Sequence, residues 1–249
     1  MIILPFNRCL QQHNFEFFSF NSTTSTMDEA KFKIDSVNKN LIVLANEQTK
    51  GRGRHGNKWI SPSGNIYCSI ALSVNLPSKD LFKFGMLVSV AVKRSLEHIG
   101  LVDILFKWPN DIYCRNKKIS GVIQECYLNK LEKQILITGV GINFLSSPRN
   151  NTYQTTHITE YVKNISREQY FEIFINYFLN YFNEFFLNKD IDFIFEYKKI
   201  QMFLNTNIKI KVDENKIIDG KFIGINDDGS LMLIKDNKEL SIYSGQIQV

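Results

Sequence analysis

The chain contains little cysteine, proline and tryptophan. Its 249 residues include 4 cysteines, 5 prolines and 2 tryptophans. The cysteines form no C-x-x-C pair and show no regular spacing; they are Cys9, Cys68, Cys114 and Cys126. A disulfide framework or a cysteine-rich zinc site is therefore not expected, and reduced thiols point to a cytoplasmic location.

Long apolar runs and targeting signals are also missing. No segment approaches the roughly 18 consecutive apolar residues that a membrane helix needs. The first five residues lack the basic lead and the apolar core of a secretory signal peptide. We therefore expect no membrane attachment. The formal net charge of +5 is too small to predict binding to nucleic acid by itself.

The chain does contain enough apolar material for a packed core, with 44% hydrophobic and 13% aromatic residues. Hydrophobic periodicity predicts strands at residues 41–45, 66–74, 103–108, 121–128 and 134–140, and helices at residues 81–99 and 167–187. We expect residues 146–163 to form an irregular, partly mobile connection. The second helix carries a stripe of phenylalanines that we expect to face the core: Phe171, Phe174, Phe178, Phe182 and Phe185.

After Asn205 the sequence pattern changes to short strands separated by turns. Three short strands are predicted at residues 208–212, 216–225 and 230–234, with turn signals at residues 213–215 and 227–229. This pattern indicates a small β-barrel. We therefore predict an α+β fold, in which residues 1–204 form a mixed β-sheet domain with packed helices and residues 205–249 form a small β domain.

One glycine-rich loop dominates the chemistry of the sequence: Gly51-Arg52-Gly53-Arg54-His55-Gly56-Asn57-Lys58-Trp59. Its glycines match the G-x-G-x-x-G dinucleotide fingerprint. However, a turn-rich stretch and a strand follow, where the fingerprint requires a helix whose N-terminus faces a pyrophosphate. The expected acidic residue is also missing, since the nearest candidate is Asp80. The remaining interpretation is that this cationic loop binds an anion. The alternative is a basic turn that is exposed to solvent.

Several other segments accompany this loop in a fixed order. They are Ser25-Thr26-Met27-Asp28-Glu29-Ala30, Gln48, Lys107-Trp108-Pro109-Asn110-Asp111, Lys118-Ile119-Ser120-Gly121 and Gly139-Val140-Gly141-Ile142-Asn143. Together with the loop they resemble the motif set of biotin–protein ligases, and the resemblance spans the whole chain. It implies a class II synthetase-like biotin/lipoate ligase fold with a C-terminal SH3-like β-barrel.

The resemblance also implies two half-reactions that use biotin, ATP and Mg²⁺. The carboxylate of biotin attacks the α-phosphorus of ATP, which gives biotinyl-5′-AMP and pyrophosphate. A lysine of a biotin carboxyl carrier domain then attacks the mixed anhydride and releases AMP. Because repulsion between a carboxylate and a polyphosphate dominates the first step, nearby cations must neutralise the charge. The second step needs an uncharged amine, so a carboxylate should hold the incoming ammonium and accept its proton.

The resemblance assigns roles to individual positions. The candidate catalytic residues are Arg54, Lys107, Asp111 and Lys118, with Asp111 as the partner of the incoming lysine. The candidate biotin-binding residues are Ser25, Thr26, Met27, Gln48, Gly51, Arg52, Gly53, Arg54, Lys118 and Gly121. The candidate ATP-binding residues are Arg52, Arg54, Lys58, Trp59, Asn110, Lys118 and Asn143, although a plain turn role is the alternative for Asn143. No metal ligand is assigned, and the loop is expected to be disordered until it closes over the acyl-adenylate.

Three alternatives remain beside this interpretation. A lipoate–protein ligase would use the same fold and chemistry, but its R-R-x-S-G-G type signature is absent. A non-catalytic biotin-binding regulator would not need both the cationic loop and Lys118. Some relatives carry an N-terminal DNA-binding domain, but too few residues precede Ser25 here, so no DNA binding is expected. Some relatives also place an aromatic residue near adenine; only Phe144 and Tyr153 are available, and the adenine contact stays unassigned.

Overall fold

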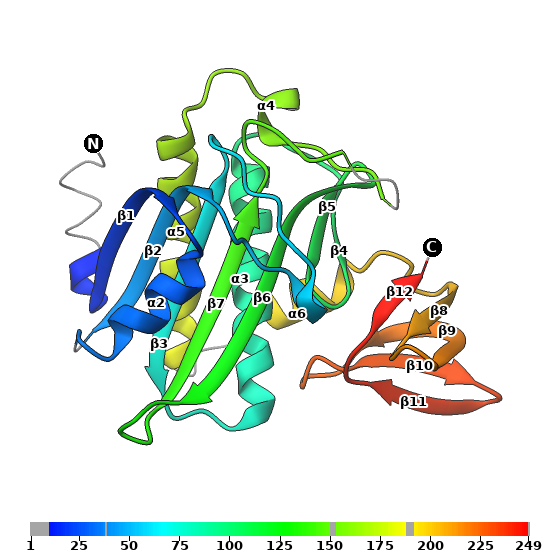
Figure 1. The fold of residues 1–249 in the computed structure, drawn as a ribbon. Coiled ribbons are helices and arrows are strands. Elements are labelled where there is room, and N and C mark those ends of the chain that lie inside the picture. Colours follow the sequence, from blue (N-terminus) through cyan, green and yellow to red (C-terminus); the bar gives the residue numbers. More distant parts are fainter. Residues whose placement is uncertain (1–9, 38, 150–152, 188–191, 249) are drawn as a thin grey trace.

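The structure is a computed structural model that describes residues 10–37, 39–149, 153–187 and 192–248. Its centre is a seven-stranded mixed sheet with the order β1-β2-β3-β7-β6-β5-β4 (Figure 1). The strands are β1 (Phe15–Thr23), β2 (Asn40–Gln48), β3 (Ile66–Val74), β4 (Ile104–Lys107), β5 (Asp111–Cys114), β6 (Lys117–Leu128) and β7 (Gln134–Ile142). β1 and β2 are parallel, and every later neighbour pair in the sheet is antiparallel.

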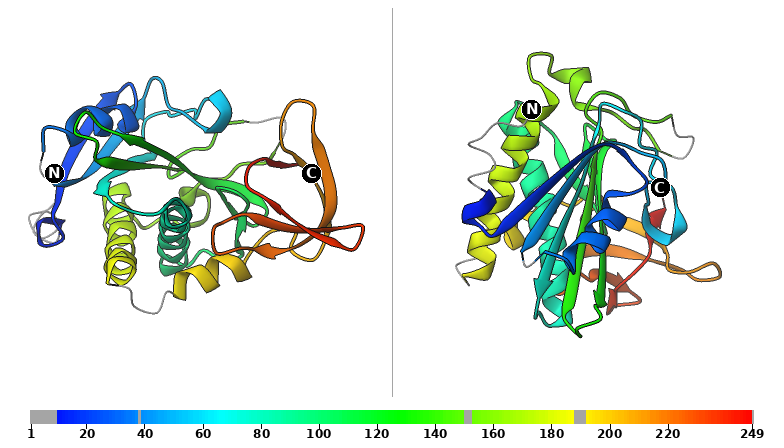
Figure 2. Two further views of the ribbon diagram at one scale, coloured as in Figure 1. Left: turned by 90° about the horizontal axis from the view of Figure 1, so that it is seen from below. Right: turned by 60° about the vertical axis from the view of Figure 1, so that its left-hand side comes forward.

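Helices cover both faces of this sheet, as Figure 2 shows. α3 (Ser78–His98) and α5 (Arg167–Phe186) lie together on one face, with α6 (Asp192–Lys199) packed against α3. α2 (Thr26–Ile34) lies on the other face, over β2, β3 and β7. The strands therefore carry apolar residues on both sides: in β2, Ile42 packs toward α3 and α5, whereas Val43 packs toward α2.

The aromatic stripe of α5 faces the core, as predicted. Phe171, Phe174 and Phe178 are at most 1% exposed, and edge-to-face ring contacts link the stripe to Phe15 and Phe84. The helix begins at a capping box, in which Ser166 accepts from the backbone N–H of Gln169 while the Gln169 side chain accepts from that of Ser166.

The C-terminal part is a five-stranded antiparallel sheet with the order β11-β10-β9-β8-β12. The strands are β8 (Asn207–Lys211), β9 (Ile217–Ile225), β10 (Leu231–Lys235), β11 (Lys238–Ile242) and β12 (Gln246–Gln248). Their inward residues include Ile210, Phe222 and Leu233, each fully buried. The predicted α+β class and the C-terminal β domain are confirmed. The division into residues 1–204 and 205–249 stays a prediction about independent units.

One buried hydrogen bond joins the main sheet to the C-terminal sheet, and one ring contact joins β4 to α6. The Trp108 indole is 1% exposed, and its Nε1 donates to the carbonyl oxygen of Gly229 at 2.9 Å. The Phe106 ring stacks on Tyr197 of α6 with centroids 4.7 Å apart. These contacts fix the turn between β4 and β5, which carries the predicted K-W-P-N-D residues and contains a cis Trp108-Pro109 peptide bond.

The predicted helices and the early strands are found within a few residues of their expected ends, but several elements were not predicted. They include β1, β5, β11, β12 and α6, and the short 3₁₀ helix at Arg54–Gly56. The predicted connection at residues 146–163 contains only α4 (Ile158–Tyr161); residues 150–152 of it lie outside the described ranges. Within the described ranges no helix is long and apolar enough to span a membrane.

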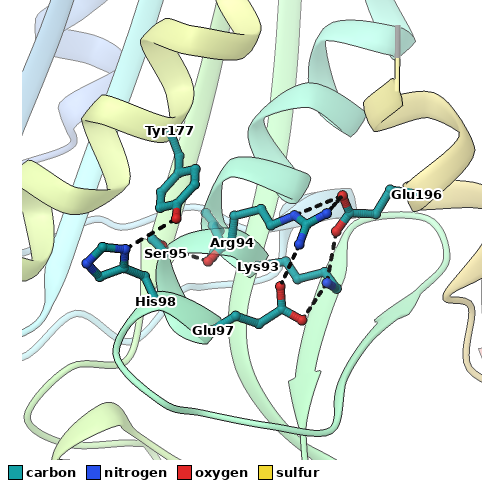
Figure 3. Close-up of polar contacts among 8 residues, drawn as sticks. Lys93, Arg94, Ser95, Glu97, His98, Tyr177 and Glu196 are labelled. Atoms are coloured by element: carbon teal, nitrogen blue, oxygen red, sulfur yellow. Dashed lines mark hydrogen bonds and ion pairs between the residues drawn. The ribbon is translucent and has the colours of Figure 1, made fainter.

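An ion network joins α3 to α6 (Figure 3). The Lys93 ammonium is nearly buried and lies 2.6 Å from Glu97 Oε1 and 2.8 Å from Glu196 Oε1. Arg94 Nη2 lies 2.7 Å from the second Glu196 oxygen. Since a buried ammonium needs carboxylate partners to offset its lost hydration, Glu196 is the residue on which this helix contact depends.

We expect Glu196→Gln to destabilise the protein by about 1–3 kcal/mol, because it leaves the buried Lys93 ammonium with one carboxylate partner instead of two. For a chain of this size the melting temperature should fall by roughly 2–4 °C per kcal/mol, measured by calorimetry. Glu168→Gln is the matched control, since Glu168 pairs with Arg167 at 3.3 Å but has a half-exposed side chain. An equal loss in both variants would contradict a role for burial.

Candidate functional site

The predicted site residues gather around one cavity of about 370 Å³. The cavity lies between the loop at residues 51–59, the start of α2, the β4–β5 turn, the middle of β6 and β7, and β12. Fourteen of the sixteen predicted positions line it: Ser25, Thr26, Met27, Gln48, Arg52, Gly53, Arg54, Lys58, Trp59, Lys107, Asn110, Asp111, Lys118 and Gly121. Gly51 instead lines a neighbouring cavity, and Asn143 lines neither.

One edge of the cavity is a chain of neutral hydrogen-bonding groups. Gln48 Oε1 accepts from the backbone N–H of Thr26 at 2.8 Å and from its hydroxyl at 3.0 Å, and Gln48 Nε2 donates to Ser61 Oγ at 3.1 Å. Ser25 is 1% exposed and makes no capping bond to α2. These short side chains therefore present fixed polar groups suited to a neutral, planar, amide-like ligand.

The floor of the cavity is made of glycines. A Cβ on Gly141 would lie 2.4 Å from Cε2 of the Trp59 indole, and one on Gly121 would lie 3.0 Å from Cζ3 of the same ring. A Cβ on Gly139 would lie 2.8 Å from the Met27 sulfur. The indole and the thioether therefore rest directly on the backbone of β6 and β7. This gives the cavity an apolar floor and wall.

The loop is folded onto the site in this structure. The Gly53 N–H donates to the carbonyl oxygen of Asn57 at 2.7 Å, and the Trp59 N–H donates to that of Gly51 at 3.0 Å. A Cβ on Gly51 would lie only 2.5 Å from the Trp59 carbonyl oxygen, so this close approach requires glycine. The predicted disorder of the loop in the ligand-free enzyme stays a prediction.

Cations outnumber carboxylates around the cavity. Its lining residues include one carboxylate, Asp111, and five cationic side chains: Arg52, Arg54, Lys58, Lys107 and Lys118. Arg52 pairs with Asp28 and Glu125, which do not line the cavity, so the other four cations share Asp111. Such an excess, close to low-dielectric walls, attracts an anion. Burial lowers the pKa of Arg54 and of Lys107, and Asp111 opposes both shifts. The site is therefore prepared for a ligand that carries several negative charges.

Lys118 and Asp111 form an ion pair within this group of cations. Lys118 Nζ lies 2.7 Å from Asp111 Oδ1, with both side chains largely buried. The Trp59 and Tyr153 rings flank the same ammonium, each with its centroid 5.2 Å away. Asp111 lies on β5 and Lys118 on β6, so the antiparallel pairing of these strands brings the two side chains together.

Other protein groups hold the side chains of two predicted site residues. Arg52 points to α2 and β6, where it pairs with Asp28 and Glu125. Asn143 is 3% exposed, and its side-chain N–H donates to the Thr156 carbonyl oxygen at 3.0 Å. That bond supports the turn role that was the alternative for Asn143.

The sequence did not identify several residues that line the site. Gln246 and Ile247 of β12 line the cavity, and the Gly245 carbonyl oxygen accepts from Arg54 Nη1 at 3.2 Å. No sequence motif marks them, because they reach the site only through the packing of the C-terminal sheet. Tyr153 also lines the cavity, whereas Phe144 is buried in the core. Burial therefore leaves Tyr153 as the accessible one of the two candidate aromatic residues.

A second, larger cavity of about 1340 Å³ lies beyond the loop. It is bounded by the loop, the first half of α3 and residues 122–125 of β6, and by Tyr197 and Tyr243. β5 pairs with β6 only up to Gly121, so the strand edge beyond that residue borders this cavity. The two cavities share the loop, Pro109 and Asn110 as a common wall.

Comparisons with known proteins agree with this geometry. Residues 17–143 match the biotin/lipoate A/B protein ligase family, and residues 203–249 match the biotin protein ligase C-terminal domain. The structure is similar to that of a biotin protein ligase from Aquifex aeolicus in complex with biotin and ATP, with a TM-score of 0.76 and 27% identity over 94% of this chain and 97% of that chain.

Curated relatives give the same result. The chain is 25% identical to a bifunctional ligase/repressor from Bacillus subtilis, over 84% of this chain and 66% of the relative. It is 25% identical to the corresponding protein of Escherichia coli, over 87% of this chain and 72% of the relative. It thus spans about two thirds of the length of these relatives. A biotin–[acetyl-CoA-carboxylase] ligase from Paracoccus denitrificans is 30% identical over 51% of this chain and 53% of the relative.

The fold and the site together combine a mixed sheet covered by helices with a cationic cavity beside a neutral polar edge. The chain belongs to the biotin/lipoate A/B protein ligase family, because the family model covers just over half of it. Residues 203–249 match a domain that is described as that of biotin protein ligases. The predicted resemblance to biotin–protein ligases is therefore confirmed. The roles of individual site residues stay predictions.

We expect Gly141→Ala to weaken biotin binding by roughly 5- to 150-fold, because a Cβ at 2.4 Å forces the Trp59 indole off the cavity floor. Titration calorimetry with biotin measures this change. Gly121→Ala is the graded control, since its Cβ lies 3.0 Å from the ring and a small shift accommodates it. Wild-type affinity in Gly141→Ala would show that the ring does not shape the binding site.

Proposed function

We propose that this chain activates biotin with ATP to form biotinyl-5′-AMP and then transfers the biotin to a lysine of a carrier protein. The observation that carries the proposal is the cavity of about 370 Å³. It combines a neutral hydrogen-bonding edge, an apolar glycine floor and a cluster of cations around a single carboxylate. Biotin has matching parts: a polar ureido rim, an apolar bicyclic body with its side chain, and a terminal carboxylate.

Biotin binds along the hydrogen-bonding edge in this proposal. Ser25, Thr26 and Gln48 contact the ureido group, and the Gln48–Thr26 bonds fix the orientation of the amide before the ligand arrives. Met27 and Trp59, resting on the glycine floor, contact the apolar body. The carboxylate then points to Lys118, whose ammonium is held by Asp111 and two aromatic rings.

The first half-reaction joins two anions, and the cations around the cavity lower its cost. Arg54, Lys107 and Lys118 surround the position where the carboxylate meets the α-phosphate, in a partly buried setting that strengthens each attraction. Lys58 and Asn110 also line the cavity and reach the nucleotide. Tyr153 supplies an aromatic face for adenine beside Lys118.

Magnesium enters this scheme as part of the substrate, MgATP. No group of three or more histidine, cysteine, aspartate or glutamate side chains occurs close together in the described parts of the chain. The phosphates and water therefore supply most of the ligands of the ion, with Asp111 and Asn110 as the available protein oxygens. Bound Mg²⁺ neutralises charge on the triphosphate.

The second half-reaction brings a protein lysine to the acyl-adenylate. Asp111 binds the incoming ammonium, because it is the one carboxylate at this cavity, and it takes the proton that the amine must lose. The larger cavity beyond the loop gives the lysine a route, since the two cavities share the wall at Asn110. The partner is a biotin carboxyl carrier domain, and the free thiols of Cys68, Cys114 and Cys126 fit a cytoplasmic setting.

The direct test incubates the protein with MgATP, biotin and an apo carrier domain. We expect release of pyrophosphate and a carrier mass shift equal to biotin minus water, with no such shift when lipoate replaces biotin. Lys118→Gln should slow pyrophosphate release about 100-fold or more, because it removes a cation from the reacting anions. Lys117→Gln, on the exposed neighbouring lysine, is the matched control. A lipoyl mass shift, or no pyrophosphate, would reject the proposal.

Arg54→Gly should release biotinyl-5′-AMP into solution faster than wild type. The change removes both a cation of the cavity and the bond from the loop to the Gly245 carbonyl oxygen. The measurement is the dissociation rate of labelled biotinyl-AMP after a single turnover. Arg115→Gly, which removes an arginine at a left-handed position outside the cavity, should retain the intermediate. Equal dissociation rates of biotinyl-AMP in both variants would contradict the proposal that Arg54 closes the site.

A further inference from the structure

Arg52 differs from the other cations of the loop because two carboxylates hold it. Its Nη1 lies 2.5 Å from Asp28 Oδ1, and its Nη2 lies 3.1 Å from Glu125 Oε1. Asp28 belongs to α2 and Glu125 to β6, which are separate elements on the sheet face that carries the site. One guanidinium therefore ties the loop to two elements at once.

The charge balance at Arg52 is opposite to that at the reacting centre. Arg52 with its two partners carries a net charge of −1, whereas Arg54, Lys107 and Lys118 share the single carboxylate of Asp111. A phosphate at Arg52 would meet two carboxylates and would be repelled. The guanidinium is therefore placed to hold protein groups rather than a phosphate.

The backbone at Arg52 is part of the same attachment. Arg52 forms an antiparallel β-bridge with Lys58, which closes the base of the loop. An attached Arg52 side chain therefore holds both segments of this bridge in place. Trp59, which follows Lys58 and forms a wall of the cavity, is held with them. All three side chains are between 37% and 48% exposed, so each pair is weak enough to break and re-form.

We propose that Asp28 and Glu125 are positioning residues that hold the loop closed through Arg52 and thereby set how long the acyl-adenylate is retained. Neither carboxylate touches the reacting atoms. They act on the equilibrium between the closed and the open loop, so they control release of the intermediate and not its formation. This proposal rests on the proposed function, because retention has meaning only if an adenylate is formed.

The test compares wild type with Asp28→Asn, Glu125→Gln and the double variant. Each exposed pair contributes a factor of about 5 at most, so we expect the double variant to release biotinyl-AMP about 3- to 10-fold faster. The rate of pyrophosphate formation and the KM for ATP should stay near wild type. Glu132→Gln with Glu168→Gln, which removes the same charge at two other exposed carboxylates, should change neither rate.

Charge reversal and salt separate this role from a general structural one. Arg52→Glu should release the intermediate quickly, and adding Glu125→Arg should restore part of the retention. The release rate should rise more steeply with ionic strength in wild type than in the Asp28→Asn/Glu125→Gln double variant, because salt also screens the Arg52 ion pairs that only wild type has. The proposal would be overturned if the KM for ATP of the double variant rose by the same factor as its release rate of biotinyl-AMP. That result would indicate that Arg52 binds a phosphate.

Hydrogen exchange gives a readout that does not need catalysis. The ligand-free double variant should exchange the amides of residues 51–59 faster than wild type, while those of α5 stay unchanged. If wild type forms no biotinyl-AMP and this difference is still seen, the proposed function fails and the attachment of the loop stands. Unchanged exchange, or faster exchange without faster release of the intermediate, overturns the inference.

Discussion

In the proposed function, the repulsion between a carboxylate and a triphosphate is the constraint on which this site depends. Cations must be gathered to overcome it, yet they also repel one another when no ligand is bound. The fold meets both requirements by placing Asp111 among Arg54, Lys107 and Lys118. A single carboxylate keeps the cluster together and still leaves an excess of positive charge for the substrates. In the proposed function the same carboxylate receives the amine in the second step.

Close backbone approach is the second requirement, because the proposed function places both an apolar body and a reactive anhydride in a cavity of about 370 Å³. Glycines at positions 121, 139 and 141 let the Trp59 indole and the Met27 sulfur lie directly on the sheet. The C-terminal sheet completes the wall with β12 and accepts a hydrogen bond from Arg54. The loop is therefore held from three sides: by α2 and β6 through Arg52, by the glycine floor through Trp59, and by the C-terminal sheet through Arg54.

The glycine-rich loop has two kinds of arginine, although its sequence alternates them regularly. Arg54 faces the cavity with one nearby carboxylate, whereas Arg52 faces away from the reacting centre and is held by two. In our proposals, Arg54 therefore neutralises the ligand and Arg52 holds the loop closed over it. That division follows from which elements pack beside each side chain, because a guanidinium takes whatever anion lies within reach.

The sequence alone determined the family, the α+β class, the core-facing stripe of α5 and the set of residues that come together, since these depend on residue type, spacing and periodicity. It missed β5, because the residues between the strands predicted at 103–108 and 121–128 are rich in Asn and Lys and indicated a turn. The predicted nucleotide contacts of Arg52 and Asn143 stay predictions. Only the tertiary structure decided that Arg52 meets Asp28 and Glu125, that Asn143 holds a turn, and that β12 reaches the cavity. The physical reason is that a side chain's partners lie far away along the chain, on elements whose packing no local pattern encodes.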